Sequence, residues 1–143
     1  MGHVYGNFTL RNARKRGLPS KVVRAMVDTG ANTLCLPPAL AHELQLDEVE
    51  KRQVKLADGG RHWVPYVGPV QLSFAGRHSF GGAFVMGDEV LIGAIALQDL
   101  DLIVGPALET VTVHPDSPGV ARGYAYSPRT LDNPWAGPFP QHT

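Results

Sequence analysis

The sequence predicts an all-β domain with one or two short helices. Short apolar segments rich in β-forming residues alternate with turn residues through the first two thirds of the chain. Only two segments have a helical pattern, and both are short. From His114 onward the density of proline excludes long helices and central strands.

The expected strands follow one another in hairpins. The first hairpin joins 4–10 to 22–27 across a basic run, which we interpret as a solvated tip, with nucleic-acid contact as the lesser alternative. Asp58-Gly59-Gly60 is a strong signal for a tight turn between two further strands. The remaining strands are expected at 33–36, 52–56, 62–66, 70–74, 80–86, 90–92, 102–104 and 110–113.

The two helices have simple signals. Pro37-Pro38 precedes a short helix over 39–44, because proline is favoured in the first turn. Residues 94–100 follow Gly93 and predict a second short helix. We therefore expect a domain at 1–113 and a Pro/Gly-rich C-terminal extension at 114–143, whose aromatic residues favour docking over complete disorder.

Composition narrows the classes of function. The 143 residues suffice for one domain with a core, and the 13 basic residues balance the 13 acidic ones. Zero net charge argues against nucleic acid or an acidic membrane as a partner. Because the first residues contain no secretory apolar region and the longest apolar run, 90–97, is too short to span a bilayer, we expect a soluble, cytoplasmic protein.

Metal and cofactor sites are not expected. Cys35 is the single cysteine and alternates with Leu34 and Leu36, so we interpret it as a small buried hydrophobe. No two of the six histidines have the i, i+4 spacing of a helical zinc site. The acids outside the motif described next are interpreted as surface charges: Asp47, Glu48, Glu50, Asp88, Glu89, Asp99 and Asp101.

The most informative motif is Asp28-Thr29-Gly30-Ala31, which occurs once. It lies between two apolar strands, so a carboxylate leaves a buried strand on a tight glycine turn. The tripeptide alone is weak, since an Asp-Gly turn after a strand is common. Its context strengthens it: a glycine-tipped hairpin follows, and then the apolar pair Leu91-Ile92 ending at Gly93.

In this order the motifs resemble those of the retropepsin-like aspartic proteases, over roughly residues 3–113. The loop at 27–31, the helix at 40–46, the hairpin at 54–60 and the segment at 91–94 all have counterparts in that family. The resemblance implies a small closed β-barrel-like acid protease fold with a flap hairpin. It also implies an aspartic endopeptidase in which two copies of Asp28, one from each chain of a homodimer, activate water to hydrolyse a polypeptide.

The same resemblance assigns the site residues. Asp28, Thr29 and Gly30 would be catalytic: Thr29 would lock the two loops together, and Gly30 would permit close backbone approach. The residues expected to bind substrate are Ala31, Ala57, Asp58, Gly59, Gly60, Ile92 and Gly93. Local turn capping by Thr29, a plain surface hairpin at 58–63 and a simple strand end at Gly93 are the alternatives.

Two other functions stay open. The cleft could hold a peptide without hydrolysing it, or the dimer could serve as a scaffold. An unrelated all-β domain with a fortuitous motif is the remaining alternative. The intact Asp28-Thr29-Gly30 set favours catalysis, because an inactive copy need not keep it.

Overall fold

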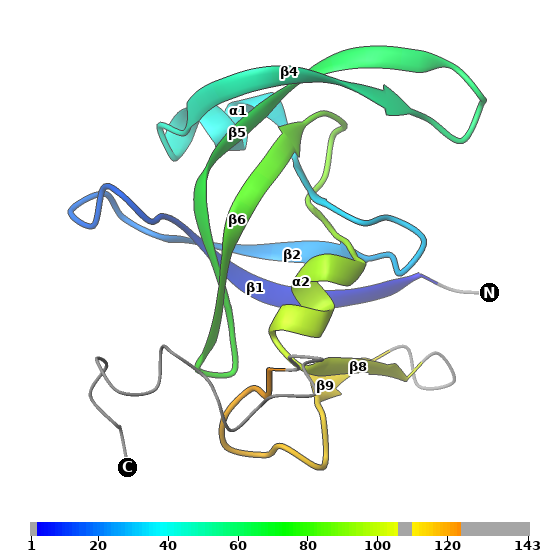
Figure 1. Ribbon diagram of the computed structural model, residues 1–143. Helices are drawn as coiled ribbons and strands as arrows, with labels where there is room; N and C mark the ends of the chain where they lie inside the picture. Colours follow the sequence, from blue (N-terminus) through cyan, green and yellow to red (C-terminus); the bar gives the residue numbers. More distant parts are fainter. Residues whose placement is uncertain (1–2, 106–109, 124–143) are drawn as a thin grey trace, which may run out of the picture.

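The computed structural model describes residues 3–105 and 110–123 (Figure 1). The described part contains nine strands and two short helices. In chain order the elements are β1 (Val4–Asn12), β2 (Lys21–Val27), β3 (Leu34–Leu36), α1 (Pro38–Glu43), β4 (Asp47–Lys55), β5 (Arg61–Phe74), β6 (Arg77–Val85), β7 (Leu91–Ile92), α2 (Ala94–Asp99), β8 (Leu102–Gly105) and β9 (Thr110–Val113). The prediction of an all-β domain with short helices is confirmed.

Six strands close into a barrel. Their order is β1-β2-β7-β3-β6-β5, and pairing of β1 with β5 completes the ring. Most neighbours are antiparallel, but β2 pairs with β7 and β3 with β6 in parallel. The barrel encloses an apolar core that includes Phe8, Leu10, Leu36 and Ile92, none more than 1% exposed.

The fourth and fifth strands form a long hairpin that extends away from the barrel (Figure 1). The sequence predicts that β4 begins at residue 52, but it begins at Asp47. Because nearly every β4 residue is exposed, burial imposes no alternating pattern that would reveal the strand's first half. Two strands were expected at 62–66 and 70–74. They are one continuous strand, β5, whose pairing with β6 shifts register between Val67 and Val70.

The last two strands form a separate two-stranded sheet that packs against β1, at the end of the molecule away from the β4–β5 hairpin (Figure 1). A Cβ on Gly6 would lie 2.7 Å from Val111 Cγ1, so glycine allows this close approach. No helix in the described residues is long and apolar enough to cross a membrane.

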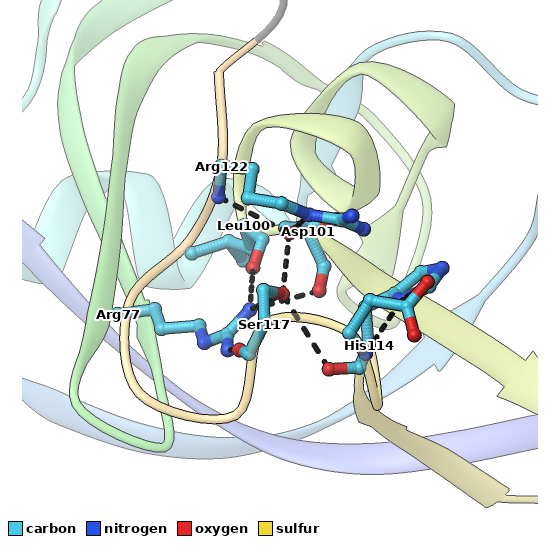
Figure 2. A network of polar contacts seen from close by, with 7 residues as sticks. Arg77, Leu100, Asp101, His114, Ser117 and Arg122 are labelled. Atoms are coloured by element: carbon cyan, nitrogen blue, oxygen red, sulfur yellow. Dashed lines mark hydrogen bonds and ion pairs between the residues drawn. The ribbon is translucent and has the colours of Figure 1, made fainter.

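After β9 the chain returns to the domain. We call residues 114–123 the strap. Its Ser117 is 5% exposed, and the Ser117 hydroxyl donates to Asp101 Oδ2 at 2.5 Å. Arg122 donates to the same oxygen from its backbone nitrogen and from Nε, at 3.1 and 2.9 Å (Figure 2). Residues 124–143 of the expected extension lie outside the described residues, and the boundary at 113/114 stays a prediction.

The interpretation of Asp101 as a surface charge was wrong. Asp101 is 7% exposed, and its pKa is held well below its usual range, first by the hydrogen bond from the Arg122 side chain and then by that from Ser117. Beneath it lies Arg77, 3% exposed, whose Nη1 donates to the carbonyl oxygens of Leu100 and Asp101 at 3.0 and 2.9 Å. The partners of Asp101 lie 16 and 21 residues away, so no local pattern reveals them.

Candidate active site

The Asp28 loop begins where β2 ends. Parallel pairing with β7 continues one residue past the strand, because Asp28 N–H donates to Ile92 O at 3.0 Å. Ala31 N–H returns to Asp28 O at 3.2 Å, and Gly30 N–H donates to Asp28 Oδ1 at 2.8 Å. The loop is therefore closed by both backbone and side chain, which fixes the direction of the carboxylate.

The start of α2 supports the loop from behind. Ala94 N–H donates to Ala31 O at 2.8 Å, and Ile95 N–H donates to Asn32 O at 3.1 Å. A Cβ on Gly93 would lie 2.5 Å from the carbonyl carbon of Asn32. Only glycine permits this approach, because contacts under 3.0 Å with backbone force a shift.

A cleft of about 590 Å³ opens over the loop. Asp28, Gly30 and Ala31 lie at its base, and the β4 end of the long hairpin closes one side. Its remaining lining consists of Asn32, Thr33, Cys35, Gln53, Val54, Lys55, Leu56, Ala57, Phe84, Met86 and Leu91. Among the described residues, Asp28 is the one carboxylate in this lining, so a single chain supplies one acid to a largely apolar cleft.

The tip of the hairpin is a glycine turn. Gly60 N–H donates to Asp58 Oδ1 at 2.7 Å, and Gly59 has a φ of 85°, in the left-handed region that favours glycine. Leu56 and Gly60 are joined by a backbone hydrogen bond of 2.9 Å. Trp63, on the β5 side of the tip, is 68% exposed. The predicted turn at Asp58-Gly59-Gly60 is thus present at the end of a long, solvated hairpin.

The structure brings some of the expected site residues together and separates others. Asp28, Gly30, Ala31 and Ala57 line one cleft. Thr29 is exposed beside the cleft. The Ile92 side chain is fully buried, and its carbonyl oxygen accepts the hydrogen bond from Asp28 N–H. Residues 58–60 form the hairpin tip, outside the lining, and Gly93 lies buried behind the loop.

The apolar wall of the cleft was not predicted from the sequence. It is made by Cys35, Phe84, Met86 and Leu91. Cys35 is only partly buried, which corrects its interpretation as a core residue. Leu34 and Leu36 face the core, and because side chains alternate along a strand, Cys35 faces the cleft. Burial, and secondarily the charge of Asp28, raises the pKa of the Cys35 thiol. The alternation at 34–36 was the signal that could have revealed this.

The cleft has few side chains that can carry charge. Within its lining the titratable groups are Asp28, Cys35 and Lys55. No group of three or more histidine, cysteine or acidic side chains within residues 3–105 and 110–123 lies close enough together to hold a metal ion.

Comparison with known proteins agrees with this geometry. A family model described as aspartyl protease matches residues 15–76. The EIAV protease, solved with the inhibitor HBY-793, has a TM-score of 0.52 at 22% identity, covering 69% of this chain and 88% of that one. The retroviral protease-like domain of Ddi1 from Leishmania major has a TM-score of 0.55 at 15% identity, covering 80% and 90% respectively. No curated protein matches the chain in sequence.

The family match spans the Asp28 loop and the β4–β5 hairpin, while the two solved structures share the fold of the closed barrel. The chain therefore has the fold of the retropepsin-like aspartic proteases, and its segment at 15–76 is similar to the aspartyl protease family.

Proposed function

We propose that the protein is an aspartic endopeptidase that is active as a homodimer. The observation that carries this proposal is the partly exposed Asp28 carboxylate, oriented by Gly30 N–H at 2.8 Å in a cleft roomy enough for side chains of a peptide. The described part of one chain supplies only one carboxylate to this cleft. General acid–base hydrolysis of an amide needs both a base and an acid, so a second group is required.

A two-fold axis would supply the second carboxylate. Such an axis brings a residue against its own copy, and Thr29, which is exposed next to Asp28, would then contact the partner loop. Two carboxylates at short range cannot both ionise cheaply, so the pair would share one proton, as the paired carboxylates of aspartic proteases are known to do.

Catalysis follows from the shared proton. The ionised Asp28 takes a proton from a water held between the two carboxylates, and the water oxygen bonds to the scissile carbonyl carbon. The protonated Asp28 of the other chain donates its proton to the carbonyl oxygen, giving a gem-diol. Proton transfer to the amide nitrogen then breaks the C–N bond and releases a carboxylic acid and an amine.

The remaining roles follow from position. The β4–β5 hairpin would act as the flap, closing over substrate and excluding water. Ala31 and Ala57, which line the cleft, would contact the peptide, whereas Gly59 and Gly60 would allow the tip to bend. Gly93 would act from behind, by letting α2 support the loop.

Asp28→Asn tests the chemistry. An amide cannot serve as the base, so we expect peptide cleavage to fall by at least about 10³-fold while the melting temperature stays nearly unchanged. Asp88→Asn is the matched control, because Asp88 is an exposed acid outside the cleft. Equal cleavage by Asp28→Asn and the parent protein would refute the proposal. Tight peptide binding by the parent protein without any turnover would favour the non-catalytic alternative.

Dilution tests the dimer. Activity per chain should fall as the concentration drops through the dimer dissociation constant, in parallel with the dimer fraction measured by analytical ultracentrifugation. Thr29→Val removes the hydroxyl and should shift this transition to higher concentration, whereas Thr29→Ser keeps the hydroxyl and should shift it less. Constant specific activity in samples shown to be monomeric would contradict a shared site.

A further inference from the structure

A groove lies on the outside of the barrel, between α2 and β6, with exposed apolar side chains at its middle and polar side chains where it meets the strap. Phe80 on β6 is 65% exposed and Ile95 on α2 is 62% exposed. Two adjoining hollows of about 140 and 930 Å³ share Phe80, Ile95 and Ser79 in their linings. We call this surface the α2–β6 groove. It is separate from the cleft over Asp28, since the two linings share only Thr33.

The strap ends at this groove. Arg122 and Gly123, the last described residues, line its larger hollow together with Asp101 and His114. The position of Arg122 is fixed, because three of its nitrogens donate to the Asp101 carboxylate at 2.9 to 3.3 Å. Figure 2 shows Arg122 against Asp101, beside the end of α2. The 20 residues that follow therefore begin at the groove itself.

The chemistry of the following segment suits the exposed apolar side chains of the groove, Phe80 and Ile95. Residues 124–143 contain four aromatic side chains, Tyr124, Tyr126, Trp135 and Phe139, against one acidic and one basic residue. Its prolines restrict the unbound chain, so ordering it costs less entropy than ordering a flexible one. Even a fraction of its full reach, about 3.3 Å per residue, spans a groove that starts at Gly123.

We propose that residues 124–143 dock in cis into the α2–β6 groove and cover Phe80 and Ile95 with their aromatic side chains. The strap then acts as a clamp that holds the segment at high effective concentration next to its surface. This inference goes beyond the proposed protease activity and does not depend on it. The groove lies on α2, and the first residues of the same helix support the Asp28 loop.

Tryptophan fluorescence gives a direct test in the full chain. The two tryptophans are Trp63, in the hairpin, and Trp135. Trp63→Phe leaves Trp135 as the single reporter. We expect its emission to be blue-shifted and its quenching by acrylamide to be several-fold slower than in a free peptide of residues 124–143. Phe80→Ser or Ile95→Ser in the same background should shift both values toward those of the peptide. Both residues are largely exposed, so the barrel should keep its circular dichroism.

Val49→Ser is the matched control, because Val49 is 66% exposed on β4, away from the groove. It should leave the Trp135 signal unchanged. Trp135 emission equal to that of the free peptide, or insensitive to both groove substitutions, would overturn the proposal. A signal that rises with protein concentration would overturn docking in cis and point to a second copy. Adding Asp28→Asn should not change the fluorescence, so failure of catalysis and failure of docking are separate outcomes.

Discussion

Asp28 and Asp101 are both carboxylates that accept backbone N–H groups, yet their surroundings are opposite. Asp28 Oδ1 accepts one hydrogen bond, from Gly30, and in the described part of the chain no cation contacts it. Asp101 accepts from the Ser117 hydroxyl and from three nitrogens of Arg122, including an ion pair at 2.9 Å. Asp28 is oriented by one hydrogen bond and has room to accept more, whereas Asp101 already accepts four.

Under the proposed function, this difference distinguishes a catalytic carboxylate from a structural one. A carboxylate accepts up to about four hydrogen bonds, and one held by a cation and several donors is strongly disfavoured from taking up a proton. A catalytic acid–base group must exchange protons, so it needs orientation without saturation. Asp28 fits the first role and Asp101 the second.

Gly93→Ala should have the largest effect, because it disturbs the support of the Asp28 loop by α2. The new Cβ would lie 2.5 Å from the Asn32 backbone, so the loop or α2 must move. We expect a loss of about 1 to 3 kcal/mol in the free energy of unfolding, the range for overpacking, together with a large loss of activity. Thermal unfolding and peptide cleavage measure the two effects.

Gly81→Ala is the control for that experiment, since a Cβ at Gly81 meets no atom within 4 Å. Because alanine orders a strand at less entropic cost than glycine, it should be neutral or slightly stabilising. Normal stability and activity in Gly93→Ala would mean that the loop does not depend on its contact with α2.

Asp101→Asn tests the Asp101 side of the comparison. It should lower the melting temperature by several degrees at neutral pH, and the rate of peptide cleavage expected under the proposed function should stay unchanged. The pH dependence follows from the lowered pKa of Asp101. Because the folded state favours the ionised form, its stabilising effect is complete above the ordinary carboxyl pKa of about 4, and it is lost as the pH falls below that value toward the depressed one.

The melting temperatures of Asp101→Asn and the parent protein, measured from about pH 7 down to about pH 2, test this sign. The difference should be constant above about pH 5 and should shrink in stronger acid. A difference that grows as the pH falls would contradict the assignment. If the assignment is right, Asp101 stays ionised and bound to Arg122 of the strap throughout mildly acidic conditions.

Much of the fold was predictable because its signals are local. The Asp28 turn, the glycine-tipped hairpin and the two helices after Pro37 and Gly93 each depend on a few neighbouring residues, and the structure contains all of them. Closure of the barrel was expected only through the family resemblance. Its closing pair joins β1 to β5, about 60 residues apart, and strand alternation alone does not choose such partners.

The missed features depend on such distant contacts. The apolar wall of the cleft combines residues from β3, β6 and β7, and the Asp101 cluster joins the end of α2 to the strap. Asp101 has no neighbours in the sequence that reveal its environment. Cys35 was assigned to the core because cysteine is usually buried, although its alternation with two core leucines pointed outward.

Cys35 also provides the finest test of the Asp28 charge, with the smallest expected effect. Burial is the larger cause of its raised pKa, and the charge of Asp28 adds to it. Asp28→Asn removes that charge, so the thiolate fraction at about pH 7.5 should rise, and alkylation by iodoacetamide should accelerate by roughly two- to threefold. Asp88→Asn should not change the rate, because Asp88 lies outside the cleft. Since Cys35 is the single cysteine, total alkylation reports this site alone. A slower reaction in Asp28→Asn would contradict the sign of the coupling, and an equal rate would mean that the Asp28 charge does not reach the cleft wall.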